Sequence, residues 1–150
     1  LTNFSGIGRR MELLGEKNGV KVYDDYANHP TAFAATIQAI KEVNPHSKIW
    51  AIIEPHTFSR LRAVLSDLPA SLKQADLVIF SQIFGSRETD PGYFTAKDIA
   101  EASHHPNCTY IPEFENIVKY VAPQVKSPDV VLVMGSGNSN KLSRQILDQL

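Results

Sequence analysis

The sequence contains one cysteine, no long apolar run and no excess of either charge. Because Cys108 stands alone among 150 residues, it can form neither an internal disulfide nor a cysteine metal cluster, which fits a reducing compartment. No apolar run approaches the roughly 20 residues that cross a bilayer, and the first residues, LTNFSG, have neither the charged nor the apolar region of a signal peptide. We therefore expect a cytoplasmic protein rather than a secreted or membrane protein.

The charged residues are balanced in number and scattered along the chain. The 15 Lys and Arg residues and the 16 Asp and Glu residues give a formal net charge of -1. They form no basic stripe for nucleic acid and no polybasic tract for anionic lipid. We therefore expect neither nucleic acid nor a membrane as a partner.

Common cofactor and catalytic signatures are also missing from the sequence. The glycine-rich stretch MGSGNSNK fits neither G-x-x-x-x-G-K-[ST] nor G-x-G-x-x-G, and glycine-rich turns are common for packing reasons. The five histidines show no H-x₃-H spacing and no cysteine partner, so we expect no metal site. No G-x-S-x-G is present either. The chain therefore lacks a complete nucleotide-triphosphate cradle of its own.

The length and composition favour one globular domain. At 150 residues and 43% hydrophobic residues, the chain is long enough for one sizeable core and too short for two ordinary domains. It begins with Leu rather than Met. We therefore expect residues 1–150 to be a single domain cut from a longer protein.

Strand and helix patterns alternate at the spacing of parallel βα units. Asn18-Gly19 favours a hairpin within 11–25, and Phe33, Ile37 and Ile40 recur at helical spacing after Pro30, which suits a first helical turn. The remaining expected strands are 48–54, 76–80, 108–112 and 129–134, and the remaining helices are 58–73 (interrupted by Pro69), 95–105, 114–125 and 139–150. The fold class is α/β: a Rossmann-like open sheet of about six strands, mostly parallel with one antiparallel strand, with helices on both faces.

Three polar clusters follow the ends of predicted strands: Asp24-Asp25, Glu54-Pro55-His56 and the segment 135–138. In open α/β sheets the ligand crevice lies at the carboxyl ends of the strands, where helix N-termini offer N–H groups to anions. A phosphate-bearing ligand is one interpretation of these clusters. The other is that strand ends are polar in any α/β domain, and that Asp or Asn before a helix is an N-cap.

Four motifs in order resemble the C-terminal domain of the Mur ligases, the ATP-dependent amide-forming enzymes of peptidoglycan precursor synthesis. They are FSGIGRRMELLGEKNGVKVYDDYANHPTA, IIEPHTFSRLRA, QADLVIFSQIFGSRE and GSGNSNKL. The resemblance implies two further domains, an N-terminal one that binds the UDP-sugar and a central one that carries the phosphate loop and holds most of the Mg²⁺ site. The C-terminal domain would close over ATP and bind the incoming amino acid or peptide. The isolated chain should then be inactive.

The resemblance assigns residues of the first motif to the nucleotide and the reaction. It implies that Arg10 reaches the γ-phosphate of ATP and that Asp25 contacts the nucleotide through its ribose. Adjacent strand residues point to opposite faces, so only one of Asp24 and Asp25 can easily face the crevice, and we expect it to be Asp25. His29 is expected at the reaction side of the cleft. Relatives usually have His where this chain has Asn28, and an amide cannot carry a proton at neutral pH. Asn28 can still position a ligand through hydrogen bonds.

The second motif implies an acceptor site. Its residues His56, Arg60 and Arg62 match the branch that adds L-alanine, in which this loop faces the amino acid and the reacting phosphate. Arg60 is the best candidate to bind the carboxylate of the amino acid. The other interpretation of these arginines, for Arg62 in particular, is that they lie on the helix surface without a ligand. Some relatives have arginine where this chain has Thr57.

Three functions stay open from the sequence. PHTFSR, SQIFGSRE and GSGN favour the ligase that joins L-alanine to UDP-N-acetylmuramate, and this is the function we expect because these segments lie nearer the acceptor. RRMELLGEKNGV, HPTA and IIEP favour the recycling ligase that attaches the murein tripeptide L-alanyl-γ-D-glutamyl-meso-diaminopimelate. A non-catalytic α/β binding module is the third, and Arg10, Asp25, His56 and Arg60 argue against it.

Overall fold

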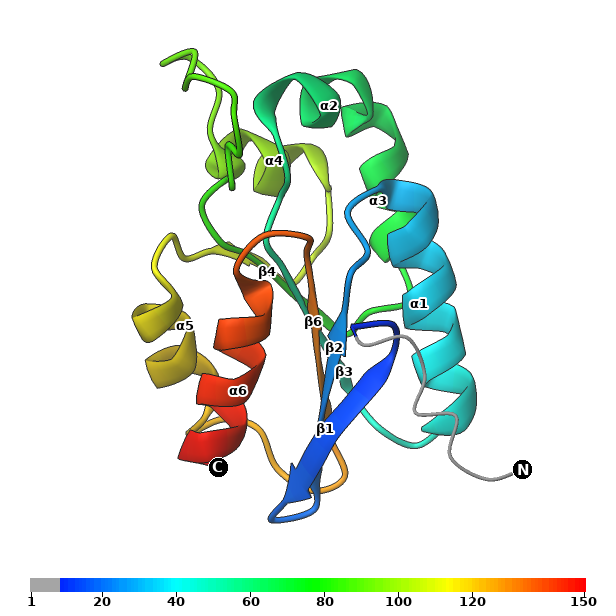
Figure 1. Cartoon of the computed structure of the whole chain (residues 1–150). Coiled ribbons are helices and arrows are strands. Elements are labelled where there is room, and N and C mark those ends of the chain that lie inside the picture. The colour runs from blue at the N-terminus through cyan, green and yellow to red at the C-terminus, as the bar shows by residue number, and fades with distance from the viewer. Residues whose placement is uncertain (1–8) are drawn as a thin grey trace, which may run out of the picture.

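The computed structural model describes residues 9–150 as one six-stranded sheet with helices on both faces (Figure 1). The strands are β1 (Glu12–Lys17), β2 (Val20–Asp25), β3 (Ile49–Ile53), β4 (Leu77–Phe80), β5 (Cys108–Tyr110) and β6 (Val130–Met134). The helices are α1 (Pro30–Val43), α2 (Phe58–Ala63), the 3-10 helix η1 (Leu65–Asp67), α3 (Leu68–Leu72), α4 (Ala96–Ala102), α5 (Phe114–Val121) and α6 (Ser139–Gln149).

The strand order is β1-β2-β6-β3-β4-β5. β1 pairs antiparallel with β2 through the turn at Asn18 and Gly19, both of which have positive φ, and all other neighbouring strands pair in parallel. The expected mostly parallel sheet with one antiparallel strand is therefore confirmed. Within the described part of the chain, no helix combines the length and the apolar character needed to cross a membrane.

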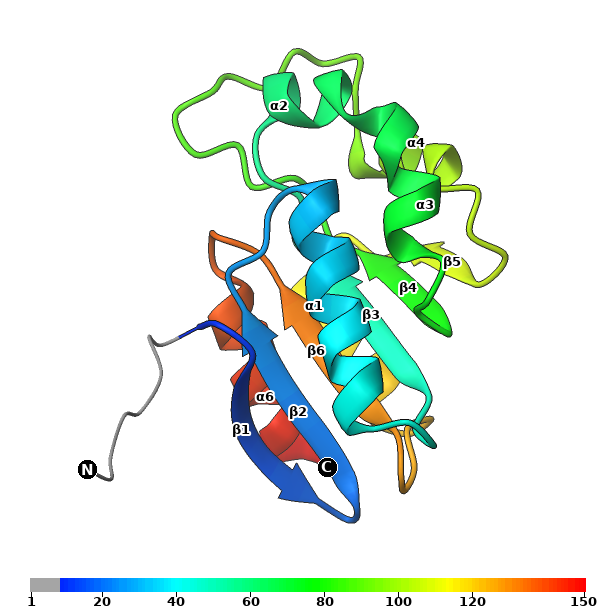
Figure 2. The same ribbon diagram turned by 90° about the vertical axis from the view of Figure 1, so that its right-hand side faces the viewer.

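Helices lie on both faces of the sheet (Figures 1 and 2), and alternate residues of the strands supply a hydrophobic core on each face. On one face, Phe33, Ile37 and Ile40 of α1 pack with residues of α3 and α4. On the other face, the apolar sides of α5 and α6 cover the sheet, with Val131 and Val133 from β6 beneath them. Because successive strand residues point to opposite faces, the fully apolar run of β6 serves both cores.

Three predicted helices differ clearly from the sequence-based boundaries, and one of them, predicted for 114–125, ends at Val121. The expected break at Pro69 lies earlier, at Val64, and Pro69 itself stands in the first turn of α3. Proline suits this place because the first-turn N–H groups have no helical partner. The helix predicted from Thr95 does begin there, with a capping box between Thr95 and Asp98, but it ends at Ala102 instead of extending to residue 105.

Candidate functional site

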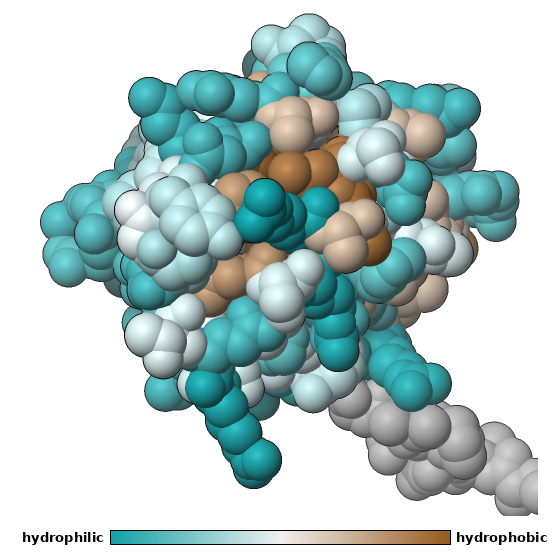
Figure 3. All heavy atoms as spheres, turned by 90° about the horizontal axis from the view of Figure 1, so that it is seen from above, coloured by the Kyte–Doolittle hydropathy of each residue, from teal (hydrophilic) through white to brown (hydrophobic). Residues whose placement is uncertain are grey.

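The site lies where β2, β6 and β3 end side by side, since β6 is inserted between β2 and β3 in the sheet. This is the topological switch point of the sheet, the place where ligands of open α/β folds bind. The three polar clusters predicted from the sequence follow these three strands and therefore meet at one edge. Seen from above, this end of the molecule shows an apolar area surrounded by hydrophilic side chains (Figure 3).

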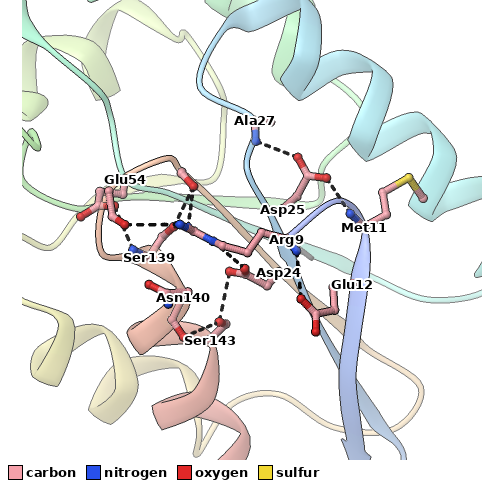
Figure 4. A network of polar contacts seen from close by, with 12 residues as sticks. Arg9, Met11, Glu12, Asp24, Asp25, Ala27, Glu54, Ser139, Asn140 and Ser143 are labelled. Atoms are coloured by element: carbon pink, nitrogen blue, oxygen red, sulfur yellow. Dashed lines mark hydrogen bonds and ion pairs between the residues drawn. The ribbon is translucent and has the colours of Figure 1, made fainter. Parts of the chain in front are cut away.

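Arg9, which the sequence analysis did not single out, lies at the centre of a polar network (Figure 4). Its Nε donates to Oδ2 of Asp24 at 3.1 Å, and one terminal nitrogen donates to the carbonyl of Gly135 and to Oγ of Ser139, both at 2.8 Å. Ser143 of α6 donates to the other Asp24 oxygen at 3.2 Å. The network thus ties β2, the glycine-rich loop and α6 together.

Asp24 is a buried carboxylate that depends on this network. Its side chain is 2% exposed, and that of Arg9 is 23% exposed. Burial raises the pKa of Asp24, while the hydrogen bond and charge of Arg9 and the hydroxyl of Ser143 act in the opposite direction. Strand alternation puts Asp24 and Asp25 on opposite faces of the sheet, and a buried carboxylate needs a cation. This alternation is the signal by which the sequence could have pointed to a structural arginine.

Arg10 extends from a turn that is held on both sides. Arg9 and Met11 both have positive φ, 66° and 46°, a conformation that disfavours side chains other than glycine. The turn is stabilised because Arg9 N donates to Glu12, Met11 N donates to Asp25, and the Arg9 carbonyl accepts from Tyr26 N. Arg10 itself is exposed. The fold therefore uses Arg9 internally and presents Arg10 to solvent.

Asp25 points to the face opposite Asp24, as predicted. One oxygen accepts from Met11 N at 2.7 Å, and the other accepts from Ala27 N at 2.8 Å and Thr36 Oγ1 at 3.4 Å. An ionised carboxylate has about four acceptor positions, so roughly one remains for a ligand. Asp25 thus both caps the local backbone and lines the adjoining pocket.

The three residues that the sequence assigned to the nucleotide line one pocket of about 450 Å³: Arg10, Asp25 and Asn28. Tyr26 and Thr36 complete its polar wall. A guanidinium at the rim suits phosphate oxygens, and a carboxylate suits ribose hydroxyls. The residues present therefore fit a nucleotide, although the pocket has no backbone phosphate loop.

Asn28 and His29 hold the connection between β2 and α1. The side-chain amide of Asn28 donates to Oγ of Ser136 at 3.0 Å and so links the nucleotide pocket to the glycine-rich loop. His29 is the N-cap of α1, where its Nδ1 accepts from Thr31 N at 3.3 Å. In this arrangement His29 caps a helix, and its reaction role stays a prediction.

The glycine-rich loop lies against an internal carboxylate. The carboxylate of Glu54, at the end of β3, accepts from Ser139 N at 2.9 Å, and the backbone N–H groups of Asn138 and Gly137 lie near it. Burial raises the pKa of Glu54, and these N–H groups together with Arg9 act against that rise. An internal carboxylate therefore stands where a phosphate would stand in a phosphate-binding loop.

His56 lies across this loop from the nucleotide pocket. Its ring stacks on Phe84 with the centroids 5.7 Å apart, and within residues 9–150 its Nδ1 is the buried side-chain atom left without a hydrogen-bond partner. Burial, and secondarily the nearby charge of Arg60, lowers the pKa of His56. The imidazole is therefore neutral at pH 7 and able to accept a proton or a hydrogen bond.

Helix α2 carries both predicted arginines of the acceptor site. Arg60 is exposed, whereas Arg62 donates to the hydroxyl of Tyr93 at 3.0 Å and lies over its ring. Glu88 binds Ser59 N at 3.1 Å and also the Ser59 hydroxyl. These contacts tie the 85–94 segment to α2 and leave Arg60 as the arginine available to a ligand.

Thr57, between His56 and α2, adopts a φ of 56°, which is unfavourable for a β-branched residue. We expect Thr57→Gly to raise the melting temperature by about 2 to 4 °C, because relief of this conformation outweighs the entropy cost of glycine by about 1 kcal/mol. Thr95→Gly is the matched control, since Thr95 has a φ of -126° and caps α4. Thermal unfolding followed by circular dichroism measures both. Equal losses of stability in the two variants would contradict the assignment of strain to Thr57.

The described residues offer no site for a resident metal ion. No group of three His, Cys, Asp or Glu side chains among residues 9–150 has the geometry to hold one.

Comparison with known proteins places this geometry in a family. The family model described as "Mur ligase, glutamate ligase domain" matches residues 9–137. The UDP-N-acetylmuramate--L-alanine ligase of Alkaliphilus metalliredigens is 41% identical over 149 residues, which cover 98% of this chain and 32% of the relative. The ligase of the same name from Caldanaerobacter subterraneus is 38% identical over 151 residues, 99% of this chain and 33% of the relative. The chain spans about a third of the length of these curated relatives.

Solved structures agree with the fold. A murein peptide ligase from Psychrobacter arcticus is 26% identical, with a TM-score of 0.80 over 97% of this chain and 30% of that one. The UDP-N-acetylmuramate-alanine ligase of Thermotoga maritima has a TM-score of 0.79 at 23% identity over the same shares, so it shows the fold alone. A single domain from Haemophilus ducreyi, ascribed to a UDP-N-acetylmuramate:L-alanyl-gamma-D-glutamyl-meso-diaminopimelate ligase, has a TM-score of 0.70 at 26% identity over 93% of this chain and 98% of its own. The match over residues 9–137 establishes that this chain belongs to the Mur ligase, glutamate ligase domain family.

Proposed function

We propose that residues 1–150 are the C-terminal domain of a bacterial, cytoplasmic, ATP-dependent ligase that joins L-alanine to UDP-N-acetylmuramate. The observation that carries the proposal is that Arg10, Asp25 and Asn28 line one pocket. Asn28 connects it through Ser136 to the glycine-rich loop, which contacts Phe84, the ring on which His56 stacks. The two curated relatives described above are both L-alanine ligases. Its partners would be the UDP-sugar-binding and central domains of the same protein.

The chemistry divides between the two sides of the glycine-rich loop. ATP supplies the phosphoryl group that activates the muramate carboxylate, with Mg²⁺ held mainly by the central domain. On the nucleotide side, Arg10 balances the negative charge that builds up on phosphoryl oxygens. Asp25 accepts a ribose hydroxyl at its remaining acceptor position and fixes the turn that presents Arg10. This domain therefore positions charge and contributes no phosphate loop.

On the acceptor side, Arg60 and His56 have complementary roles. An amino-acid carboxylate needs a cation, and exposed Arg60 offers a guanidinium for it. The neutral His56 imidazole accepts a hydrogen bond or a proton from the attacking amine. Arg62 supports this side indirectly because it holds Tyr93.

The test is ATP-dependent phosphate release by the full-length ligase with UDP-N-acetylmuramate and one acceptor at a time. Release with L-alanine alone supports the proposal. The 150-residue chain by itself should give no release, since the phosphate loop is expected in the central domain. Release by the isolated chain would contradict the division of roles between the domains.

The tripeptide-adding recycling ligase is the second candidate. The structural similarity to the Psychrobacter arcticus murein peptide ligase, with a TM-score of 0.80, favours it. Phosphate release with the murein tripeptide and none with L-alanine would select this function. Release with neither acceptor would favour a non-catalytic binding module.

Asp25→Asn should raise the apparent KM for ATP more than the KM for the amino acid. In the wild type, Met11 N and Ala27 N each donate to one oxygen of the Asp25 carboxylate. In either orientation of the new asparagine side chain, the NH₂ group replaces one of these acceptors, so one of the two hydrogen bonds is lost. Loss of one charge-assisted hydrogen bond corresponds to about 1.5 to 3 kcal/mol, or a tenfold to hundredfold effect. Steady-state kinetics of the full-length ligase measure the change in KM, and thermal unfolding measures the loss of the backbone hydrogen bond.

Asn28→His is the matched control for Asp25→Asn in the same pocket. An imidazole N–H can replace the bond from Asn28 to Ser136, so we expect near-normal kinetics. If Asp25→Asn leaves ATP dependence unchanged and only destabilises α1, the carboxylate is a structural cap and contributes nothing to nucleotide binding.

A further inference from the structure

The N-terminus of α6 has the features of an anion site that is filled from within. The backbone N–H of Ser139 donates to the Glu54 carboxylate at 2.9 Å, and the N–H groups of Asn138 and Gly137 lie close enough to lower the pKa of Glu54. The helix dipole and the Arg9 guanidinium add positive potential at the same place. Such concave arrangements of N–H groups bind phosphate in many proteins. Here the 5% exposed side chain of Glu54 takes that position.

The loop approaches Glu54 too closely for any larger residue. A Cβ atom at Gly137 would lie 2.8 Å from Oε2 of Glu54 and 2.6 Å from Cγ of Phe84. A Cβ atom at Gly135 would lie 2.9 Å from Cβ of Glu54. The two glycines therefore serve contact with a carboxylate and an aromatic ring within the protein. The glycines of the loop are thus accounted for without a bound phosphate.

The same loop joins both sides of the candidate site. Ser136 accepts from Asn28 in the nucleotide pocket, and Gly137 lies against Phe84, on which His56 stacks. Glu54 itself precedes His56 by only two residues. A shift of the loop would therefore displace Asn28 and Phe84 together.

We propose that Glu54 is a positioning residue whose carboxylate acts as a built-in anion, fixing the 135–139 loop so that the nucleotide pocket and the acceptor side keep one relative geometry. The effect of Glu54 on turnover rests on the proposed function. Its effect on stability does not, because a small carboxylate from solution can replace the carboxylate that Glu54→Ala removes from the preformed anion site. Formate and acetate are the matching probes.

The experiment compares Glu54→Ala with and without formate at pH 8, where formate is ionised. We expect the variant chain of 150 residues to melt about 4 to 10 °C lower than the wild type, since the buried N–H of Ser139 loses its charged acceptor. Formate at about ten times its dissociation constant should restore about 3 to 6 °C. Formamide, neutral and of similar size, should restore much less.

Ile79→Ala is the matched control variant. Ile79 is 2% exposed in the core under α5 and α6, so its removal leaves an apolar cavity without N–H groups. Formate should stabilise Ile79→Ala no more than the wild type. Equal stabilisation of all three proteins, or none of Glu54→Ala, would overturn the proposal, whatever the enzyme's substrate proves to be.

Glu54→Gln keeps the shape and provides a second test if Glu54→Ala does not fold. Its carbonyl oxygen can still accept from Ser139 N, so backbone amide hydrogen exchange at residues 137–139 should be slower than in Glu54→Ala and faster than in the wild type.

In the full-length ligase, below the melting transition, Glu54→Ala should lower kcat about tenfold or more, and formate should recover part of the lost kcat. Formate rescue of stability without rescue of kcat would confine Glu54 to a purely structural role and overturn the positioning role.

Discussion

Arg10→Ala is expected to lower the turnover of the full-length ligase by a factor of about 10² to 10³, with almost no change in the melting temperature of this domain. The kinetic loss follows from removing one preorganised cation from the phosphoryl group. Stability should be spared because Arg10 is exposed and its side chain makes no hydrogen bond or ion pair within the described residues. Steady-state kinetics and thermal unfolding are the two measurements.

Arg10→Lys sharpens this test. Lysine keeps the charge but not the planar fork that binds two phosphate oxygens, so its turnover should fall between those of the wild type and Arg10→Ala. If turnover is unchanged in Arg10→Ala, Arg10 is a solvated surface residue and the phosphate role must belong to another domain.

The fold was predictable because its determinants are local in the sequence. Phe33, Ile37 and Ile40 gave the first helix by their spacing, and all are buried. The apolar runs around 49–53 and 130–134 gave central parallel strands, which are covered on both faces. The α2–α3 break was misplaced because Pro69 is compatible with a helix start as well as with an interruption.

The distinction between Arg9 and Arg10 depends on tertiary contacts that residue type alone does not reveal. The two residues are adjacent and chemically identical, so their types alone cannot assign them different roles. The family resemblance assigned a role to Arg10 and none to Arg9. The division of labour comes from a turn with positive φ on either side of Arg10. Asp25 stabilises that turn through Met11 N, across 14 positions of sequence. No spacing rule connects these residues.

The carboxylate contacts with helix starts were also invisible in the sequence. Glu54 binds the start of α6 from 85 residues away, and Glu88 binds the start of α2 from 29 residues away. Capping patterns read from sequence extend over about three residues, as for Thr95 and Asp98 in α4. The segment 87–93 is a largely exposed loop, and Glu88 and Tyr93 attach it to α2.

In contrast to Arg10→Ala, Arg9→Ala is expected to cause a large loss of stability. Removal of Arg9 leaves the Asp24 carboxylate buried without its cation and takes a donor from Gly135 and Ser139. Loss of one partner of a buried ion pair costs about 3 to 5 kcal/mol, and the partial exposure of Arg9 favours about 3 kcal/mol. This corresponds to a melting temperature lower by roughly 6 to 12 °C.

The loss should depend on pH in a defined direction. Burial already raises the pKa of Asp24, and Arg9 opposes that rise, so the pKa of Asp24 in folded Arg9→Ala must be higher still. A carboxyl group whose pKa is raised on folding favours the folded state below its unfolded pKa, and that contribution is lost as pH rises through the folded pKa. The stability gap between Arg9→Ala and the wild type should therefore widen from pH 4 to pH 8.

The double variant Arg9→Ala/Asp24→Asn tests this explanation directly. If an uncompensated charge causes the loss, replacing Asp24 with a neutral residue of the same shape should recover part of the stability at pH 8 and remove the widening of the gap with pH. The amide can still accept from Ser143. If instead the two substitutions add independently, Arg9 stabilises the domain mainly through Gly135 and Ser139, and the ion pair with Asp24 contributes little.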